Sequence, residues 1–243
     1  MLSILNIHTA YNELTLLRYK YEYCKKYGLY LYVIDNMSND GTKEFLEQNN
    51  IQHSFLDTDG AFDLRPLLDE TNRMLHEIKP DWFIYSGVDM FYESKKGIRG
   101  SIESADAEGY SSLRTLCYTI RSTGEYREGN PFKVYHCATK GAQLTLISKY
   151  NECIKIIPDQ IFGKKGIVKD EGNFYEMHGT KRPEERKETL RRREKAWDNG
   201  MNKGWGTHYL DGDAVNFTFN KESMLDLSDD ILYKKLGDTF DAH

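Results

Sequence analysis

Cysteine is scarce in this chain of 243 residues, which contains only four: Cys24, Cys117, Cys137 and Cys153. Each stands alone, and no C-x-x-C pair occurs. Structural zinc sites and redox motifs usually need such paired spacing. The sequence therefore disfavours structural zinc and is typical of a protein of the reduced cytoplasm.

Long apolar runs and excess positive charge are also missing. No stretch approaches the roughly 18 consecutive apolar residues of a membrane span, and residues 1–6 lack the basic head and cleavage site of a secretory signal. The net charge of −5 gives no general attraction to nucleic acid or to anionic lipid. We therefore expect no membrane span and no nucleic-acid partner, while the oligomeric state is left open.

Several familiar catalytic motifs are absent as well. The first expected strand is not followed by a glycine fingerprint or by a G-x-x-x-x-G-K-[ST] loop, which disfavours an ordinary dinucleotide oxidoreductase and a P-loop enzyme. No G-x-S-x-G elbow occurs, and neither H-E-x-x-H nor an EF-hand loop is present.

The first hundred residues alternate between strand and helix patterns. Apolar runs predict strands over residues 3–8, 29–34, 51–56 and 82–86. The intervening patterns predict a helix capped by Asn12 and stopped at Gly28, a helix over 42–48, and a helix that Pro66 opens and that ends before Pro80. Such alternation predicts an α/β fold with a mostly parallel central sheet flanked by helices.

Polar residues follow each of these expected strands: His8 and Thr9, Asp35 and Asn36, Asp57 to Asp59, and Asp89. Ligands of open α/β sheets bind beyond the carboxyl ends of the strands. Two carboxylates at one such edge, Asp35 and Asp89, suit a nucleotide and a divalent cation. The alternatives stay open: Asp35 can instead form an Asx turn, Asp89 can be a solvated strand end, and Asp40 reads as turn and helix-start chemistry.

The second half is less regular. Strand-like pieces occur at 110–120 and 142–148, and a long charged helix is expected from Pro183 to Asn199. His178 precedes that helix, which suits a metal ligand followed by phosphate-binding charge at Arg182 and Arg186. The alternative is a core histidine beside a solvated basic face.

Two segments of the first half resemble the family-2-like glycosyltransferases with the GT-A fold. Residues 7–13, I-H-T-A-Y-N-E, are similar to that family's first strand and its Asn-Glu pair. Residues 33–42 closely resemble its D-N-x-S-x-D-G-T segment.

Later segments extend the resemblance over most of residues 3–209. Residues 81–91 are similar to the family's D-W-(apolar)-x-x-D-x-D-x-F metal motif, and 178–182 are similar to an H-x-x-x-R motif. Trp197 and the G-T-H-Y run at 206–209 resemble the end of the catalytic region. We expect one catalytic domain over 1–209, with a nucleotide-binding half (1–100) and an acceptor and closure half (101–209), and a C-terminal extension over 210–243.

The resemblance implies a site for a nucleoside-diphosphate sugar. Asn12, Glu13 and Asp35 would lie by the nucleoside, together with the neighbouring strand-end residues. Asp89 and His178 would hold Mn²⁺ or Mg²⁺. The candidate partners of the phosphates are Lys181 and Arg182.

Two further expectations concern the chemistry. Gly87 stands where the family's metal motif has its first aspartate, which removes a carboxylate from the site. If the anomeric carbon is inverted, a carboxylate must take the acceptor proton, and the candidates are Asp170, Glu171 and Asp159.

The sequence thus predicts a metal-dependent hexosyl- or related transferase that acts on a glycan, a lipid-linked sugar or another hydroxyl acceptor, with inversion at the anomeric carbon. One alternative is a nucleotide-sugar-binding protein that has lost turnover, motivated by Gly87. Another is a nucleotidyltransferase, although no glycine-rich basic loop follows the first strand.

Overall fold

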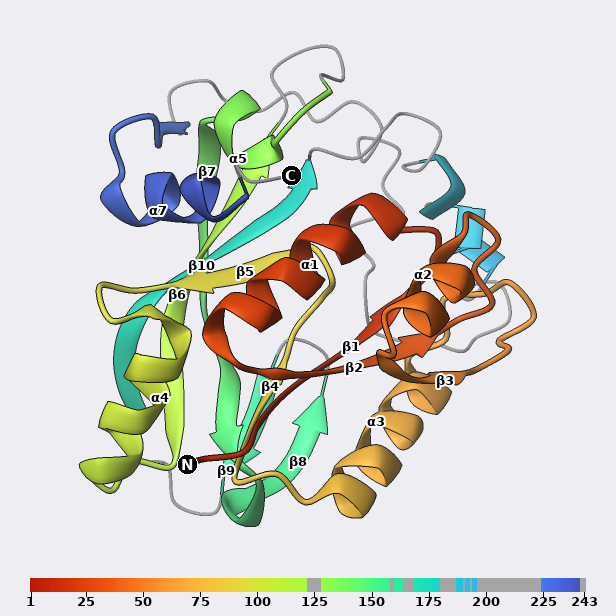
Figure 1. Ribbon diagram of the computed structural model, residues 1–243, viewed down its shortest axis with the longest axis horizontal. Coiled ribbons are helices and arrows are strands. Elements are labelled where there is room, and N and C mark those ends of the chain that lie inside the picture. Colours follow the sequence, from red (N-terminus) through yellow and green to blue (C-terminus); the bar gives the residue numbers. More distant parts are fainter. Residues whose placement is uncertain are drawn as a thin grey trace.

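The computed structural model describes residues 1–121, 128–157, 160–163, 168–179, 187–189, 191–192, 194–195 and 224–240 (Figure 1). Its strands are β1 (Ile4–Ala10), β2 (Tyr30–Asp35), β3 (Gln52–Phe55), β4 (Trp82–Tyr85), β5 (Met90–Glu93), β6 (Ser112–Arg121), β7 (Cys137–Lys149), β8 (Cys153–Ile157), β9 (Gln160–Gly163), β10 (Val168–Gly179) and β11 (Leu225–Asp226). Its helices are α1 (Leu14–Tyr27), α2 (Thr42–Gln48), α3 (Leu64–Ile78), α4 (Gly97–Ala107), α5 (Pro131–Val134), the 3₁₀ turn η1 (Tyr150–Glu152) and α7 (Ile231–Thr239).

The main path of the sheet has the order β3-β2-β1-β4-β7-β6-β10-β5. The first four strands of this order, β3, β2, β1 and β4, run parallel to one another. Strands β6 and β10 also pair in parallel. Strands β7 and β5 pair antiparallel with their neighbours. The expected α/β architecture with a largely parallel central sheet flanked by helices is confirmed.

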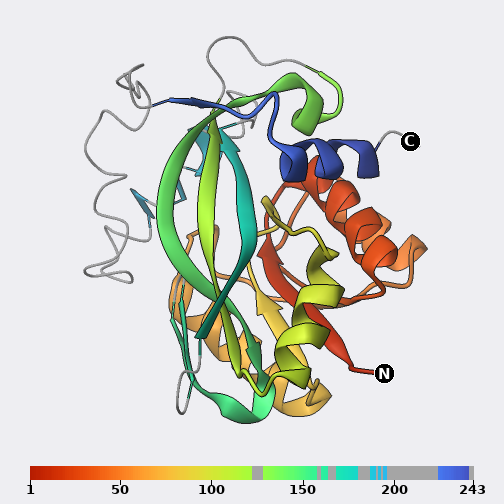
Figure 2. The ribbon, with the colours of Figure 1, turned by 90° about the vertical axis from the view of Figure 1, so that its left-hand side faces the viewer.

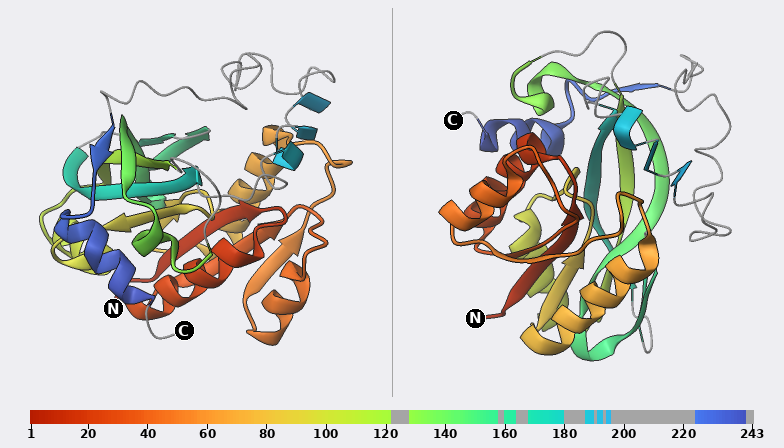
Figure 3. Two further views of the ribbon diagram at one scale, coloured as in Figure 1. Left: turned by 90° about the horizontal axis from the view of Figure 1, so that it is seen from above. Right: turned by 90° about the vertical axis from the view of Figure 1, so that its right-hand side faces the viewer.

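Helices cover both faces of the parallel strands. Successive side chains of a strand point to opposite faces, and in β1 Ile4 and Ala10 join the larger core cluster with residues of α1 and α4. Leu5 and Ile7 join a second cluster with residues of α3. Figure 3 shows α1 and α3 on opposite sides of these strands. Each fully buried aliphatic side chain of this kind contributes about 1.5–3 kcal/mol of transfer free energy.

The helix ends follow local signals, with two corrections. Gly28 stops α1 in the left-handed conformation, at φ 60°, as expected from its lack of a Cβ atom. Asn12 is not the cap: it has a φ of 51°, and Glu13 occupies the cap position without a side-chain cap bond. Helix α3 begins before Pro66, because the Asp63 side chain accepts a hydrogen bond from the Arg65 amide (3.0 Å).

The buried face of α1 also differs from the simplest apolar stripe. Leu17 and Cys24 are buried as their spacing predicts, but Lys20 and Tyr23 are buried too. Tyr23 donates a hydrogen bond to the Tyr92 carbonyl (2.7 Å), so α1 contacts strand β5 as well as β1. A polar end group can therefore lie on the buried face of α1, because a main-chain carbonyl there accepts its hydrogen bond.

The C-terminal residues 224–240 pack onto this body. Tyr233, Leu236 and Phe240 belong to the larger core cluster, and Figure 2 shows α7 beside α1. The Asp230 side chain caps α7 by accepting from the Tyr233 amide (2.8 Å) and also accepts from the Tyr175 hydroxyl (2.9 Å). This part of the expected extension is therefore joined to strand β10 and to the common core.

The long charged helix expected at 183–199 falls largely outside the described residues, but its described positions, 187–189, 191–192 and 194–195, are helical. Within the part of the chain that the structure describes, no helix combines the length and apolar character needed to cross a bilayer.

Candidate functional site

The ends of parallel strands bring two acids to one edge of the sheet. Asp35 is the last residue of β2 and pairs with Ala10 of β1. On the other side of β1, strand β4 ends at Tyr85, and Asp89 follows a short turn, directly before β5. Because these strands run parallel, their carboxyl ends share the edge at which α/β sheets bind ligands.

Asp35 binds its own turn through one carboxylate oxygen, and the other is buried without a partner among the described residues. Its exposed fraction is 0%, and its Oδ1 atom accepts hydrogen bonds from the Ser38 amide (3.1 Å) and hydroxyl. Its Oδ2 atom has no hydrogen-bond partner among the described residues. Burial raises the pKa of this carboxyl despite the two Ser38 bonds. The Asx-type turn and a vacant acceptor therefore coexist in one side chain.

The loop after β1 is tied to the loop after β2. The Asn12 amide donates to the Ser38 hydroxyl (2.9 Å), and the Asn12 side-chain oxygen accepts from the Asn39 amide (2.8 Å). Asp40 accepts from the Leu14 amide (2.9 Å) and from Thr42 at the start of α2. Asp40 thus has the local role that was expected, whereas the side-chain oxygen of Asn12 is engaged in holding the two loops together.

Asn36 is enclosed by a loop and by Arg192. With its amide oriented to satisfy its neighbours, Asn36 donates to the Leu56 carbonyl (2.8 Å) and accepts from the Arg192 guanidinium. Arg192 is only 4% exposed and also donates to the Ala61 carbonyl (3.2 Å). Its guanidinium carbon lies 3.4 Å from the centre of the Tyr11 ring, an approach that favours a cation–π interaction.

Arg192 is a site-edge residue that the sequence did not single out. It lies in a run of three arginines, Arg191 to Arg193. Which of them is buried depends on how this segment packs against the sheet, which the sequence alone does not give. Thr9 and Glu13, two expected nucleotide contacts, are half-buried at the same edge. Arg192 therefore packs against this edge of the sheet, while the described residues Lys187, Arg191 and Glu194 stay exposed.

Asp89 lies where the two halves of the fold meet. Its exposed fraction is 8%, and its carbonyl accepts a hydrogen bond from the Met177 amide of β10 (2.8 Å). In the antiparallel pairing of β10 with β5, Glu176 stands opposite Met90. The backbone of His178, the residue after Met177, is therefore brought beside Asp89, although its side chain lies outside the described residues.

Gly87 gives room to the Asp89 carboxylate. A Cβ atom added at Gly87 would lie 2.5 Å from Asp89 Oδ1, a contact too short to persist without movement. The chain thus lacks the first carboxylate of the motif, and the Asp89 carboxylate occupies the space beside Gly87 that a side chain there would need.

We expect Gly87→Ala to displace the Asp89 carboxylate. If that carboxylate holds a divalent cation, the response to the cation should weaken about tenfold, the factor that about 1.4 kcal/mol produces. The measurement is the Mn²⁺ concentration needed for half of the cation-dependent thermal shift in the presence of a nucleoside diphosphate. Gly237→Ala is the matched control, because the added Cβ would meet its nearest atom at an ordinary 3.5 Å. Equal Mn²⁺ midpoints for the two variants would contradict the reading of Gly87.

Two fully buried basic side chains, His8 and Lys20, are both influenced by the charge of Asp89. His8 has an exposed fraction of 0%, and neither ring nitrogen has a hydrogen-bond partner among the described residues. Burial and the neighbouring Lys20 lower the pKa of His8 well below its usual value, while Asp89 acts in the opposite direction. His8 is therefore a neutral imidazole on the α1 side of β1.

The other sequence-based candidates are not gathered at this edge by the described structure. Asp170 and Glu171 belong to β10, but Asp170 pairs with Arg114 near the beginning of that strand. At about 3.3 Å per residue, this is roughly 20 Å from the end that meets Asp89. Asp159, Lys181 and Arg182 lie outside the described residues.

The residues present fit one mode of binding a cation. In the described ranges, no three His, Cys, Asp or Glu side chains gather as they would around a metal ion. Mg²⁺ that enters with a nucleotide is commonly held by one or two carboxylates together with the phosphates, and not by an all-protein cage. A single strand-end carboxylate such as Asp89 suits that shared mode.

Comparison with known proteins gives structural neighbours only. No family model and no curated protein sequence matches the chain. Among solved structures, Staphylococcus aureus TarS residues 1–349 match with 16% identity and a TM-score of 0.41, over 90% of this chain and 75% of that one. The longer S. aureus TarS structure matches with 14% identity and a TM-score of 0.44, over 78% and 38%.

A third structure is the 1–349 form of S. aureus TarS in complex with UDP, which matches with 18% identity and a TM-score of 0.35. This match covers 54% of the present chain and 39% of that one, so the matched part spans well under half of that structure. All three TM-scores are below 0.5, so the UDP bound in that complex is stated of TarS alone.

Proposed function

We propose that this chain is a glycosyltransferase of the GT-A type, which moves a sugar from a nucleoside-diphosphate sugar to a hydroxyl acceptor with the help of Mn²⁺ or Mg²⁺. The observation that carries the proposal is the pairing of two acids across β1. Asp35 offers a buried acceptor atom without a partner among the described residues, and Asp89 lies beyond the neighbouring strand. The sequence segments at 33–42 and 81–91 that resemble the family coincide with these two positions.

On the nucleoside side, Asp35 has the part of a hydrogen-bond acceptor. Its free Oδ2 atom suits an N–H group of a base or a hydroxyl of a ribose, and a buried carboxylate without a partner gains from such a donor. Thr9 and Glu13 are half-buried on the strand and turn beside it. Asn36 is already bonded to Leu56 and Arg192, so we assign it to shaping this side and not to direct recognition.

On the diphosphate side, Asp89 and His178 are the proposed protein ligands, with Lys181 and Arg182 as phosphate partners. A divalent ion bound there would offset the charge that develops on the departing nucleoside diphosphate. Arginine suits a phosphate through its planar, bidentate fork. The expected acceptors are a glycan, a lipid-linked sugar or another hydroxyl compound, with inversion at the anomeric carbon.

The test is a thermal-shift screen of UDP, GDP, ADP, CDP and dTDP, each with and without Mn²⁺. A ligand selective for the native state raises the melting temperature, by an amount that grows with the logarithm of its concentration relative to Kd. We expect at least one diphosphate to raise it, and Mn²⁺ to enlarge that rise. If no diphosphate shifts the melting temperature under either condition, the proposal is wrong.

A second candidate function is nucleotide-sugar binding without turnover. Gly87 favours it, because the chain lacks the first carboxylate of the metal motif. Binding would then be seen with nucleotide sugars, but neither sugar transfer nor donor hydrolysis would follow. Release of nucleoside diphosphate from any bound donor, followed over time, separates the two functions.

A further inference from the structure

A fully buried lysine lies beneath the turn that carries Asp89. Lys20 of α1 has an exposed fraction of 0%, and its ammonium donates a hydrogen bond to the carbonyl of Met90, the residue after Asp89. The same ammonium lies 4.4 Å from the centre of the Phe91 ring. A buried ammonium is costly unless charges or dipoles nearby compensate it. The groups around Lys20 must therefore supply such compensation.

The acidic residue next to this hydrogen bond is Asp89, which directly precedes Met90 in the chain and is 8% exposed. The two groups that favour the charged form of Lys20 are Cys24 and Asp89, against the effect of burial. Burial raises the pKa of the Cys24 thiol to about 12, so this thiol is uncharged at neutral pH. His8, which also acts on this region, is held neutral. Among the described groups that favour the charged form of Lys20, Asp89 is therefore the carboxylate, and the Lys20 ammonium is bonded to the main chain of the residue that follows it.

We propose that Lys20 is a built-in counter-charge to Asp89, which makes the divalent cation bind only together with the nucleoside diphosphate. This inference rests on the proposed function of the site. Without a nucleotide, a single carboxylate offset by an ammonium offers a divalent cation little net attraction. The diphosphate supplies the extra negative charge, so the cation binds only where a nucleotide is bound.

The experiment titrates Mn²⁺ alone, with no nucleotide, and follows the melting temperature and the calorimetric heat. Wild-type protein is expected to show no response at Mn²⁺ concentrations that suffice when UDP, or the best diphosphate of the screen, is present. Lys20→Met removes the charge and keeps an unbranched, flexible side chain. We expect it to bind Mn²⁺ alone at least tenfold more tightly than wild type, and the added change Asp89→Asn to cancel that gain.

Tyr23→Phe is the matched control. Tyr23 lies on the same helix, is equally buried, and donates to the Tyr92 carbonyl of the same strand, but it carries no charge. It is expected to lower the melting temperature while leaving the Mn²⁺ response as in wild type. Lys20→Arg, which keeps the charge, should also respond as wild type does. If Lys20→Met does not fold, Lys20→Gln serves in its place, because it retains a donor for the Met90 carbonyl.

The outcomes separate the two levels of the account. If wild-type protein shows no joint binding of diphosphate and Mn²⁺, the proposed function fails. If wild type shows joint binding but the neutral Lys20 variant binds Mn²⁺ alone no more tightly, the counter-charge role is wrong and the proposed function stands. Weaker binding of Mn²⁺ by that variant in every condition would also overturn the counter-charge role.

Discussion

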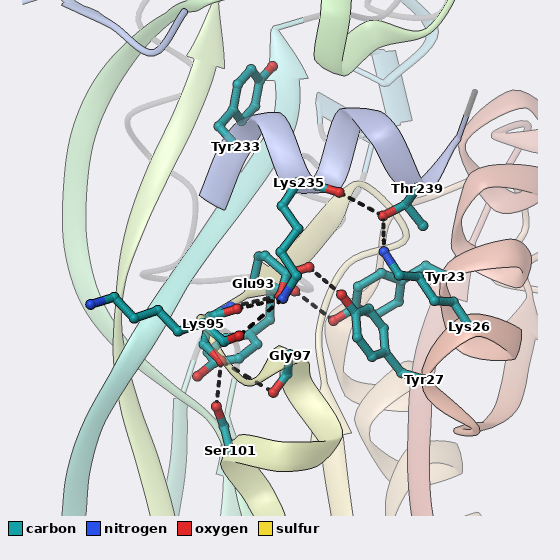
Figure 4. A network of polar contacts seen from close by, with 12 residues as sticks. Tyr23, Lys26, Tyr27, Glu93, Lys95, Gly97, Ser101, Tyr233, Lys235 and Thr239 are labelled. Atoms are coloured by element: carbon teal, nitrogen blue, oxygen red, sulfur yellow. Dashed lines mark hydrogen bonds and ion pairs between the residues drawn. The ribbon is translucent and has the colours of Figure 1, made fainter. Parts of the chain in front are cut away.

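Lys235→Met is expected to lower the free energy of unfolding by about 2–4 kcal/mol, because it leaves a buried carboxylate without its counter-charge. Glu93 at the end of β5 is 0% exposed, and the Lys235 ammonium of α7 lies 2.9 Å from its Oε1 atom (Figure 4). Lys235 also donates to the Ser94 carbonyl (2.8 Å). Glu93 would keep its bond from the Tyr27 hydroxyl, and Lys235 is partly exposed, so the expected loss is set about 1 kcal/mol below the usual range of about 3–5 kcal/mol.

The control for this change lies next to it in the sequence. Lys234 forms an ion pair of the same length, 2.9 Å, with Asp229, whose side chain is 99% exposed. Exposed pairs contribute only about 0–1 kcal/mol, so Lys234→Met should be nearly neutral in urea denaturation. The double variant Lys235→Met/Glu93→Gln should recover much of the loss. Equal effects of the two lysine variants would show that α7 is not held through Glu93.

Asp89→Asn is expected to abolish the additional stabilisation that Mn²⁺ gives to the complex with a nucleoside diphosphate. A ligand present at about 100 times its Kd adds about 2.7 kcal/mol to the free energy of unfolding, and the variant should lose the part of this that depends on the cation. The part due to the nucleotide alone should persist, because Asp35 and its surroundings are unchanged. The measurement is the melting temperature with diphosphate, with and without Mn²⁺.

Asp57→Asn is the control for the loss of one charge at this edge. Asp57 follows β3, is exposed, and accepts only a local hydrogen bond from the Asp59 amide among the bonds of the described residues. Its Mn²⁺ response should match that of wild type. A full Mn²⁺ response in the Asp89 variant would remove this residue from the cation site.

Several elements of the first half could be predicted because residues within or next to them determine where they begin and end. Gly28 ends α1 through its left-handed conformation, and helix α2 spans Thr42–Gln48 as its pattern predicts. Strand pairing in the second half was not available from the sequence. Strand β5 follows β4 closely in the chain but pairs with β10, and nothing within Met90–Glu93 identifies a partner so distant in sequence.

The candidate site shows the same division. Asp35 and Asp89 were predictable as neighbours of one edge, since parallel strands end on the same side. Lys20 and Arg192 were not, because a charged residue on a helix reads as solvent-facing until the covering elements are known. In the structure Lys20 meets the Met90 carbonyl, and Arg192 meets the Ala61 carbonyl and the Tyr11 ring.

The most direct measurement is a crystal structure with the best nucleoside diphosphate and Mn²⁺, in which anomalous scattering locates the cation. We expect the nucleoside against the Asp35 oxygen that has no partner among the described residues and the manganese bonded to the Asp89 carboxylate, with the end of β10 beside it. A nucleotide bound away from the carboxyl edge of β1 and β2, or a cation that does not touch Asp89, would contradict this expectation.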